Sequence, residues 1–173
     1  KLNMDKDRVL IFNLSEGDKI FDIIDDFVLD KNCMIVVVDS VASLLTSEDL
    51  DGDSTLGSHA RFLSKRLKRT IGLMNQNNSQ TMLLLVNQIR SKINDMWKGE
   101  MNTTSTGGKA LKYYASLRIE MDRSEFIVDK EIRKGFYARV RVIKSRFSVP
   151  HSSCEIPFIY GSGFSSVIEK IDL

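Results

Sequence analysis

Two short apolar runs, each ended by a polar pair, constrain most strongly what this chain can fold into. Met34–Val38 is followed by Asp39-Ser40, and Thr81–Val86 is followed by Asn87-Gln88. Continuous aliphatic runs of this length are typical of strands buried on both faces. Between them, Leu56–Met74 has apolar residues at helical spacing. Strand, helix and strand in this order predict a right-handed crossover between two parallel strands.

The remaining elements complete an α/β pattern. Helical spacing predicts a helix from an N-cap at Ser15 to about Leu29, with Asp18 placed as in a capping box. The apolar stretch Val9–Phe12 could form a further strand. We therefore expect a mixed, mostly parallel central sheet flanked by helices. The second half predicts a short helix near Gly108 and strands at Leu117–Met121, Tyr137–Ile143 and Glu155–Tyr160, with one wet face on the second strand.

Length and composition are those of one globular domain. The chain has 173 residues, 42% of them hydrophobic and 28% charged. No apolar run approaches the roughly 18 residues of a membrane span, and the first residues do not read as a signal peptide. Cys33 and Cys154 are not spaced as a disulfide framework or a zinc site, so a reducing cytoplasm fits best.

The net charge of +2 hides an uneven distribution of charge along the chain. Residues 1–54 carry 13 acidic and 5 basic residues, whereas residues 55–173 carry 10 and 20. No acid occurs from Thr55 to Ser79, and there Arg61, Lys65 and Lys68 share one face of the predicted helix. This face could contact the phosphates of an anionic partner, or it could be an ordinary solvated surface.

A nucleotide motif is present in part. Ile35–Asp39, four apolar residues and an acid, match the second nucleotide motif of P-loop ATPases. There a carboxylate at a strand tip holds the hydration shell of Mg²⁺. An ordinary strand followed by a turn Asp is the alternative. The phosphate cradle GxxxxGK[ST] is missing, because Gly52–Gly57 has the glycine spacing but Ser58-His59 follows it.

Several motifs occur together and in a characteristic order: Val36–Leu44 (VVVDSVASL), Val86–Arg90 (VNQIR), Gly107-Gly108 and Ala110–Arg118 (ALKYYASLR). In this order they resemble the RecA family of recombinases, most closely the bacterial and phage-borne type. ALKYYASLR is the most specific match, although the family usually has Phe or Ile where Tyr113 stands. Similar segments at Gly52–Leu67 and Arg139–Pro150 extend the resemblance over nearly the whole chain.

The resemblance begins after the family's P-loop and catalytic Glu and stops before its small C-terminal domain. It therefore implies that residues 1–173 are a single, partial RecA-like ATPase core, and we expect no ATPase activity from these residues alone.

The resemblance also implies a site for ATP and Mg²⁺. Asp39, next to Ser40, would be the acid associated with Mg²⁺ through water, and Gln88 would be the catalytic γ-phosphate sensor. Lys144 and Arg146 resemble a pair of cations that reach across a filament interface to the neighbour's ATP, although the family usually has Lys at both positions. The residues assigned to the same subunit interface are Lys112, Tyr113 and Arg118.

Contacts to DNA follow from the same resemblance. Thr46–Ser54 would be the family's first DNA loop, here short and acidic, and Gln88–Thr106 its second DNA loop. The residues expected to touch DNA are Arg61, Ser64, Lys68, Arg90, Lys92, Ile93, Met96, Trp97, Gly107 and Gly108.

A protein of this family would form a homo-oligomeric helical filament on single-stranded DNA. It would pair that strand with homologous duplex DNA and hydrolyse ATP, in recombination, repair and the SOS response to DNA damage. Two alternatives remain open. One is a filament-joining DNA-binding module without its own nucleotide hydrolysis, and the other is a different RecA-superfamily ATPase.

Overall fold

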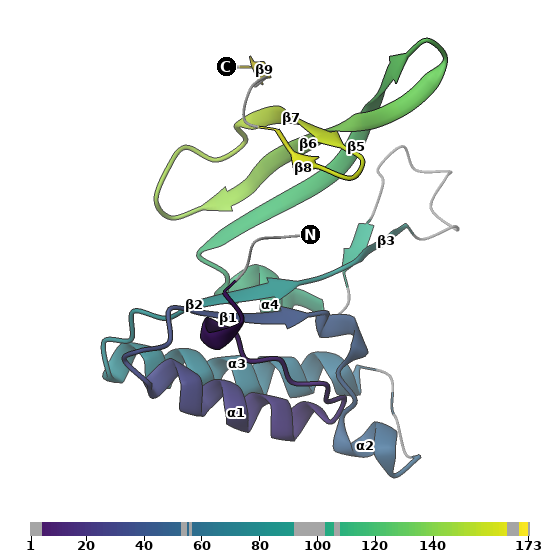
Figure 1. The fold of residues 1–173 in the computed structure, drawn as a ribbon. Coiled ribbons are helices and arrows are strands. Elements are labelled where there is room, and N and C mark those ends of the chain that lie inside the picture. The colour runs from purple at the N-terminus through teal and green to yellow at the C-terminus, as the bar shows by residue number, and fades with distance from the viewer. Residues whose placement is uncertain are drawn as a thin grey trace. The chain divides into compact units, whose positions relative to one another are not determined.

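The chain separates into two compact units, Lys1–Tyr114 (unit 1) and Ala115–Leu173 (unit 2), shown in Figure 1. The computed structural model describes residues 5–52, 55, 57–91, 103–105, 108–165 and 170–172. Unit 1 combines helices with a parallel pair of strands, and unit 2 is an antiparallel sheet.

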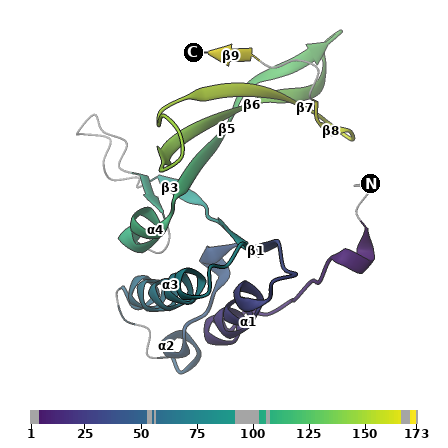
Figure 2. The same ribbon diagram turned by 90° about the vertical axis from the view of Figure 1, so that its left-hand side faces the viewer.

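Unit 1 is built on a strand–helix–strand arrangement. Strand β1 (Ile35–Asp39) and strand β2 (Met82–Val86) pair in parallel, and helix α3 (Ser58–Gln76) lies between them in the sequence. Helix α1 (Gly17–Leu29) lies beside α3 on the same face of the strand pair (Figures 1 and 2). The predicted parallel pair and its crossover helix are therefore confirmed.

The core of unit 1 fills the space between these two helices and the strand pair. Burial of these aliphatic and aromatic side chains contributes roughly 1.5–3 kcal/mol each, which makes this cluster the main support of the unit. Its buried members are Phe21, Ile24, Val28, Val38, Val41, Leu44, Leu63 and Leu67.

The strand pair is covered on one face only, so the prediction of strands buried on both faces is wrong for the described residues. Exposure alternates along both strands, and Ile35 and Val37 of β1 are each more than half exposed. Met82 and Leu84 of β2 are also exposed. The physical reason is that α1 and α3 both pack against the same face.

The start of α1 also differs from the prediction. Its N-cap is Glu16, which makes no side-chain cap, and not Ser15. The backbone here is held by Leu45 instead, because the Gly17 N–H donates to the Leu45 carbonyl (2.7 Å) and the Leu45 N–H to the Ser15 carbonyl (2.8 Å). Val9–Phe12 forms no strand, since none of the described residues pairs with it.

Two predicted loops contain regular structure. A capping box between Thr46 and Asp49 starts the short helix α2 (Ser47–Leu50) inside the segment expected to be the first DNA loop. The long polar segment after Gln88 carries two strands at its ends, β3 (Ile89–Ser91) and β4 (Thr103–Ser105), which pair antiparallel. Helix α4 (Gly108–Tyr114) begins where a short helix is predicted.

Every pair of strands that the structure describes in unit 2 is antiparallel, so the expected mixed sheet is not mostly parallel. Lys130 and Glu131 alone connect the first two strands, and both have positive φ, 47° and 66°. Such a two-residue turn can join only antiparallel neighbours, because a parallel connection needs a crossover of a dozen or more residues. The strands are β5 (Leu117–Asp129), β6 (Ile132–Ser145), β7 (Ser153–Ile159), β8 (Gly163–Phe164) and β9 (Lys170–Asp172).

The predicted wet face of β6 is confirmed. Arg139 pairs with Glu155 of β7 at 3.0 Å, and Arg141 pairs with Asp122 of β5 at 2.5 Å. On the other face, Phe136 stacks on Phe158 with ring centroids 5.0 Å apart. Charged pairs on one face and aromatic contacts on the other give this sheet the alternation expected of an antiparallel sheet with one solvated side.

Candidate nucleic-acid interface

Helix α3 carries five cations between positions 61 and 69, and the structure divides them into three groups. Arg66 belongs to the first group, which faces α1. Its guanidinium donates to the backbone carbonyl of Asp18 (2.8 Å) and to the Asp22 carboxylate, and it lies over the Phe21 ring. This hydrogen bond holds the pKa of Asp22 below its ordinary value. Arg66 is therefore a structural residue.

Arg69 is held by the same helix. Its Nε lies 3.0 Å from Oδ2 of Asp25, a carboxylate that is only 4% exposed. The other oxygen of Asp25 accepts a hydrogen bond from the buried Thr70 hydroxyl at 2.5 Å. A buried carboxylate needs such partners, because an unpaired charge in a core is costly. Arg69 thus compensates the buried negative charge of Asp25 on α1, although its own side chain remains partly exposed.

Arg61 forms the second group and contacts the segment that precedes α3. Its Nη2 donates to the Thr55 hydroxyl (2.7 Å) and lies 3.7 Å from Oε2 of Glu48 in α2. The Thr55 hydroxyl in turn donates to Glu48 (3.2 Å). The guanidinium that is expected to contact DNA is therefore already shared with a carboxylate of this chain.

Lys65 and Lys68 make up the third group. Both are exposed, and neither forms an ion pair with any residue that the structure describes. The expected DNA contacts Arg61, Ser64 and Lys68 are also exposed and follow one another at helical spacing, so the structure places them on one face of α3. This face is opposite to the one that Leu63, Leu67 and Thr70 bury.

The expected nucleotide residues meet at the carboxyl ends of β1 and β2. Asp39 pairs in register with Val86, so Asp39 and Ser40 leave β1 where Asn87 and Gln88 leave β2. The Asp39 and Gln88 side chains are exposed. Ligands of parallel sheets bind at this edge, so the arrangement agrees with the expected roles without testing them.

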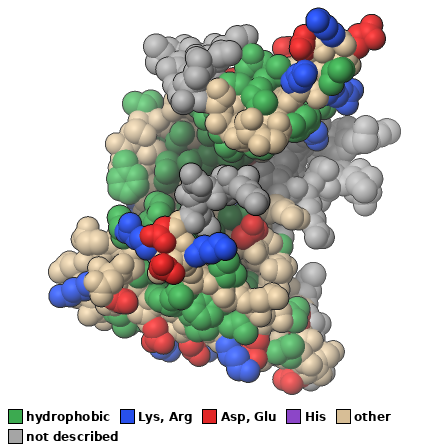
Figure 3. All heavy atoms as spheres, viewed as in Figure 1, with side chains coloured by type: hydrophobic (Ala, Val, Ile, Leu, Met, Phe, Trp, Pro, Cys, Tyr) green, Lys and Arg blue, Asp and Glu red, His purple; other side chains and the backbone are tan. Residues whose placement is uncertain are grey.

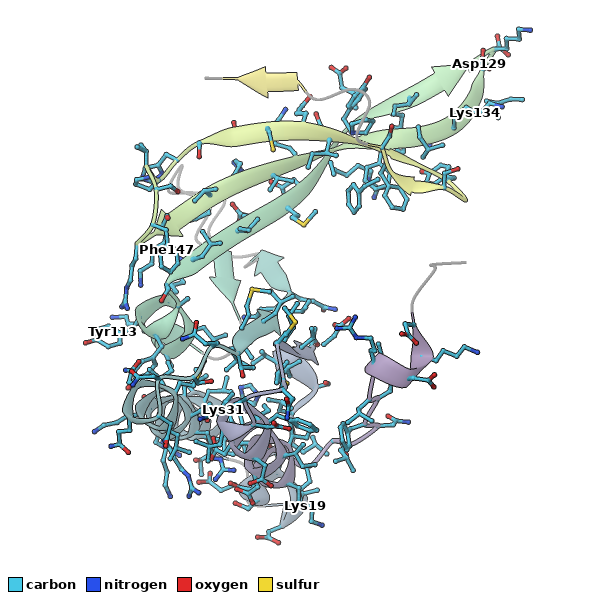
Figure 4. All side chains as sticks on the ribbon, turned by 60° about the vertical axis from the view of Figure 1, so that its left-hand side comes forward. Lys19, Lys31, Tyr113, Asp129, Lys134 and Phe147 are labelled. Carbon is cyan, nitrogen blue, oxygen red and sulfur yellow. The ribbon has the colours of Figure 1, made fainter. Side chains whose placement is uncertain are left out.

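The remaining predicted residues of unit 1 lie within the expected second DNA loop or directly after it. Arg90 lies in β3 opposite Thr104, and Gly108 is the first residue of α4. Lys112 and Tyr113 are exposed on α4, and Tyr113 points away from the packed side of this helix (Figure 4). The residues that lie outside the described part of the chain are Lys92, Ile93, Met96, Trp97 and Gly107.

Unit 2 gathers the other three predicted cations at one end of its long hairpin. Arg118 of β5 pairs in register with Lys144 of β6, and the Arg146 N–H donates to the Ser116 carbonyl (3.0 Å). Phe147, which follows them, lies at the opposite end of the hairpin from Asp129 and Lys134 (Figure 4).

Sequence reasoning missed Glu48 and Thr55, the partners of Arg61. The sequence shows that the segment expected to be the first DNA loop is acidic, but which of its acids reaches Arg61 depends on how α2 folds. For Arg66, the signal was its helical position, since it falls on the same side of α3 as Leu63 and Thr70.

Comparison with known proteins decides the family. Residues 1–165 match the family model described as the RecA N-terminal domain. The chain belongs to the RecA family. The curated Protein RecA of Gluconacetobacter polyoxogenes is 40% identical over 176 aligned positions, which cover all of this chain and 49% of the relative. Those of Acidiphilium cryptum and Desulfovibrio desulfuricans are 39% and 37% identical, with 50% and 48% of their lengths covered.

This RecA-family chain thus spans about half the length of the curated relatives it matches. In the part that the structure describes, no helix is long and apolar enough to cross a membrane.

Proposed function

We propose that this RecA-family chain contributes the DNA-contacting surface of a recombinase. The protein forms a helical filament of identical copies on single-stranded DNA. With the use of ATP, the filament pairs this strand with homologous duplex DNA. The protein acts in recombination and repair in the cytoplasm. The observation that carries the proposal is the outer face of α3, where Lys65 and Lys68 are exposed without ion-pair partners among the described residues. Phosphate contacts supply most of the affinity of nonspecific DNA binding.

The edge of the β1–β2 pair supports a role in nucleotide binding. Asp39 and Ser40 would hold Mg²⁺ through its water shell, and the Gln88 amide would donate to the terminal phosphate. A carboxylate, a hydroxyl and an amide at the carboxyl ends of parallel strands suit a hydrated magnesium nucleotide, which supplies the phosphoanhydride bond. The printed sequence has no GxxxxGK[ST] motif, so these residues do not include the usual phosphate cradle.

The subunit interface is the third part of the proposal. Lys144 and Arg146 would reach the ATP of the neighbouring copy, and Arg118, the register partner of Lys144 on β5, would belong to the same interface. Arg146 carries a planar guanidinium, which can hold two phosphate oxygens at once. Lys112 and Tyr113 are exposed on α4, as residues at such an interface would be in a single copy.

The test is binding of a fluorescein-labelled oligothymidylate by the purified chain, followed by fluorescence anisotropy at several salt concentrations. We expect Lys68→Ala to weaken binding several-fold and to lower the slope of log K against log salt by about 0.7, the value for one lost phosphate contact on a single strand. Lys31→Ala, an equal charge change outside α3, should have little effect. Wild-type affinity that does not vary with salt would contradict the proposal.

A second candidate function is a DNA-binding module that joins filaments without hydrolysing nucleotide itself. Such a module would use the same exposed lysines of α3, and ATP hydrolysis by the purified chain, with Asp39→Asn as the control, separates the two candidates.

A further inference from the structure

A shallow groove runs along the outer face of α3 beyond the residues expected to contact DNA. It is lined by Lys65, Lys68, Arg69, Gly72, Leu73 and Gln76. The groove is open at Gly72, where a Cβ would have no other atom within 4 Å and glycine places no side chain in that space. Nothing in the family resemblance assigns a role to Lys65, Gly72 or Gln76.

The charge of the groove is positive and largely uncompensated. Lys65 and Lys68 form no ion pair with the described residues, and no acid occurs from Thr55 to Ser79. Arg69 adds a third cation that is shared with Asp25 on its inner side and 61% exposed on its outer side. Groups with this arrangement select a ligand that carries several negative charges in a row.

The length of the groove fits a nucleic-acid backbone better than a single small anion. Lys65 and Gln76 are eleven positions apart on a continuous helix, which corresponds to about 16 Å at about 1.5 Å per residue. This length exceeds the separation of neighbouring phosphates in one strand, so more than one phosphate of a single strand can lie along the groove. The apolar Leu73 offers a contact for the sugars between them.

We propose that this groove binds the sugar–phosphate backbone of single-stranded DNA and extends the DNA contact of α3 toward its C-terminus. Lys65 and Lys68 neutralise phosphates, Gln76 donates its amide N–H to a phosphate oxygen, and Gly72 lets the backbone approach the helix. The proposal rests on the proposed function and lengthens the footprint of Arg61, Ser64 and Lys68 by about two helical turns.

The experiment uses the same anisotropy measurement on the whole chain with two groove variants and two matched controls. Lys65→Ala removes a charge in the groove, and Lys31→Ala removes one elsewhere. Gln76→Glu places a negative charge at the far end of the groove, and Gln80→Glu makes the same chemical change just beyond α3, outside the groove lining. Thermal unfolding by circular dichroism shows that each variant is folded.

We expect Lys65→Ala and Gln76→Glu each to weaken oligothymidylate binding about three- to ten-fold, with the salt slope of Lys65→Ala lower by about 0.7. Both controls should remain within about two-fold of the wild type. If Lys68→Ala weakens binding while Lys65→Ala and Gln76→Glu do not, the groove proposal is overturned and the proposed function stands. Equal effects of Gln76→Glu and Gln80→Glu would overturn it as well. No salt-dependent binding by the wild type would overturn both.

Discussion

Arg61, one of the proposed DNA contacts, already has partners within the chain. Its guanidinium is held by the Thr55 hydroxyl at 2.7 Å and by Glu48 at 3.7 Å, and both partners belong to the segment before α3. A DNA phosphate would have to replace the Glu48 carboxylate. Because exposed ion pairs contribute only about 0.2–1 kcal/mol, this competition would weaken DNA binding without preventing it.

Replacing Glu48 should therefore strengthen binding. We expect Glu48→Gln to bind oligothymidylate about two- to five-fold more tightly, because its amide no longer competes with phosphate for Arg61. Anisotropy titration at low salt measures the change. Asp51→Asn is the matched control, since it removes a charge from the same acidic segment at a residue with no described contact to Arg61.

The gain should depend on Arg61 itself. In an Arg61→Ala background, Glu48→Gln should no longer improve binding, which a double-mutant cycle would show. An equal gain from Asp51→Asn would contradict the competition and would indicate a general effect of the acidic segment.

At the scale of the element, two helical glycines have opposite surroundings. A Cβ at Gly17, the first residue of α1, would lie 2.6 Å from Cζ of Phe62 and 2.9 Å from the Leu45 carbonyl oxygen. A Cβ at Gly72 of α3 would meet nothing within 4 Å. Gly17 is thus required where α1 approaches the chain at Leu45. At Gly72 a larger residue would fit, so the glycine makes α3 less stable than it could be.

The same substitution should therefore have opposite effects at the two sites. Gly72→Ala should raise the free energy of unfolding by about 0.5–1 kcal/mol, since alanine favours the helix. Gly17→Ala should lower it, because the Leu45 carbonyl is backbone and cannot move aside without disturbing its hydrogen bonds. Urea denaturation followed by circular dichroism measures both, and destabilisation by Gly72→Ala would contradict this account.

The local sequence pattern predicted the main helices and strands of unit 1. It predicted less well where α1 begins and whether both faces of the strand pair are buried. The runs at β1 and β2 and the helical spacing of α3 are local signals, and all three elements formed. The start of α1 at Gly17 depends on Leu45, which is distant in sequence, so a cap at Ser15 could not be rejected beforehand. Residue type alone could not separate Arg66 and Arg69 from Lys65 and Lys68, because their partners lie on α1.

At the scale of the whole molecule, the proposed nucleotide edge and the proposed DNA-binding helix α3 belong to one strand–helix–strand unit. Asp39 and Gln88 lie at the strand ends, and the cations lie on the helix that links the strands in sequence. The printed sequence contains the proposed nucleotide contacts Asp39 and Gln88 but no GxxxxGK[ST] motif, the usual enclosure for the phosphates.

We accordingly expect the purified chain to release no phosphate from ATP above background, with or without single-stranded DNA and Mg²⁺. A coupled phosphate-release assay measures this. DNA-stimulated turnover that is lost in Asp39→Asn would contradict the expectation, and the Asp39→Asn control distinguishes such turnover from a contaminating ATPase.

The ion pairs between α1 and α3 also affect the electrostatic attraction between this protein and a distant polyanion. Arg66 and Arg69 form ion pairs with Asp22 and Asp25. The acidic α1 and the basic α3 therefore do not form separate regions of negative and positive charge. Acidic and basic side chains are interspersed over the face of unit 1 in Figure 3. Beyond the Debye length of about 8–10 Å, a polyanion meets little net attraction. If α3 binds DNA as proposed, electrostatic steering therefore accelerates encounter little, and Lys65 and Lys68 slow dissociation once the strand has arrived.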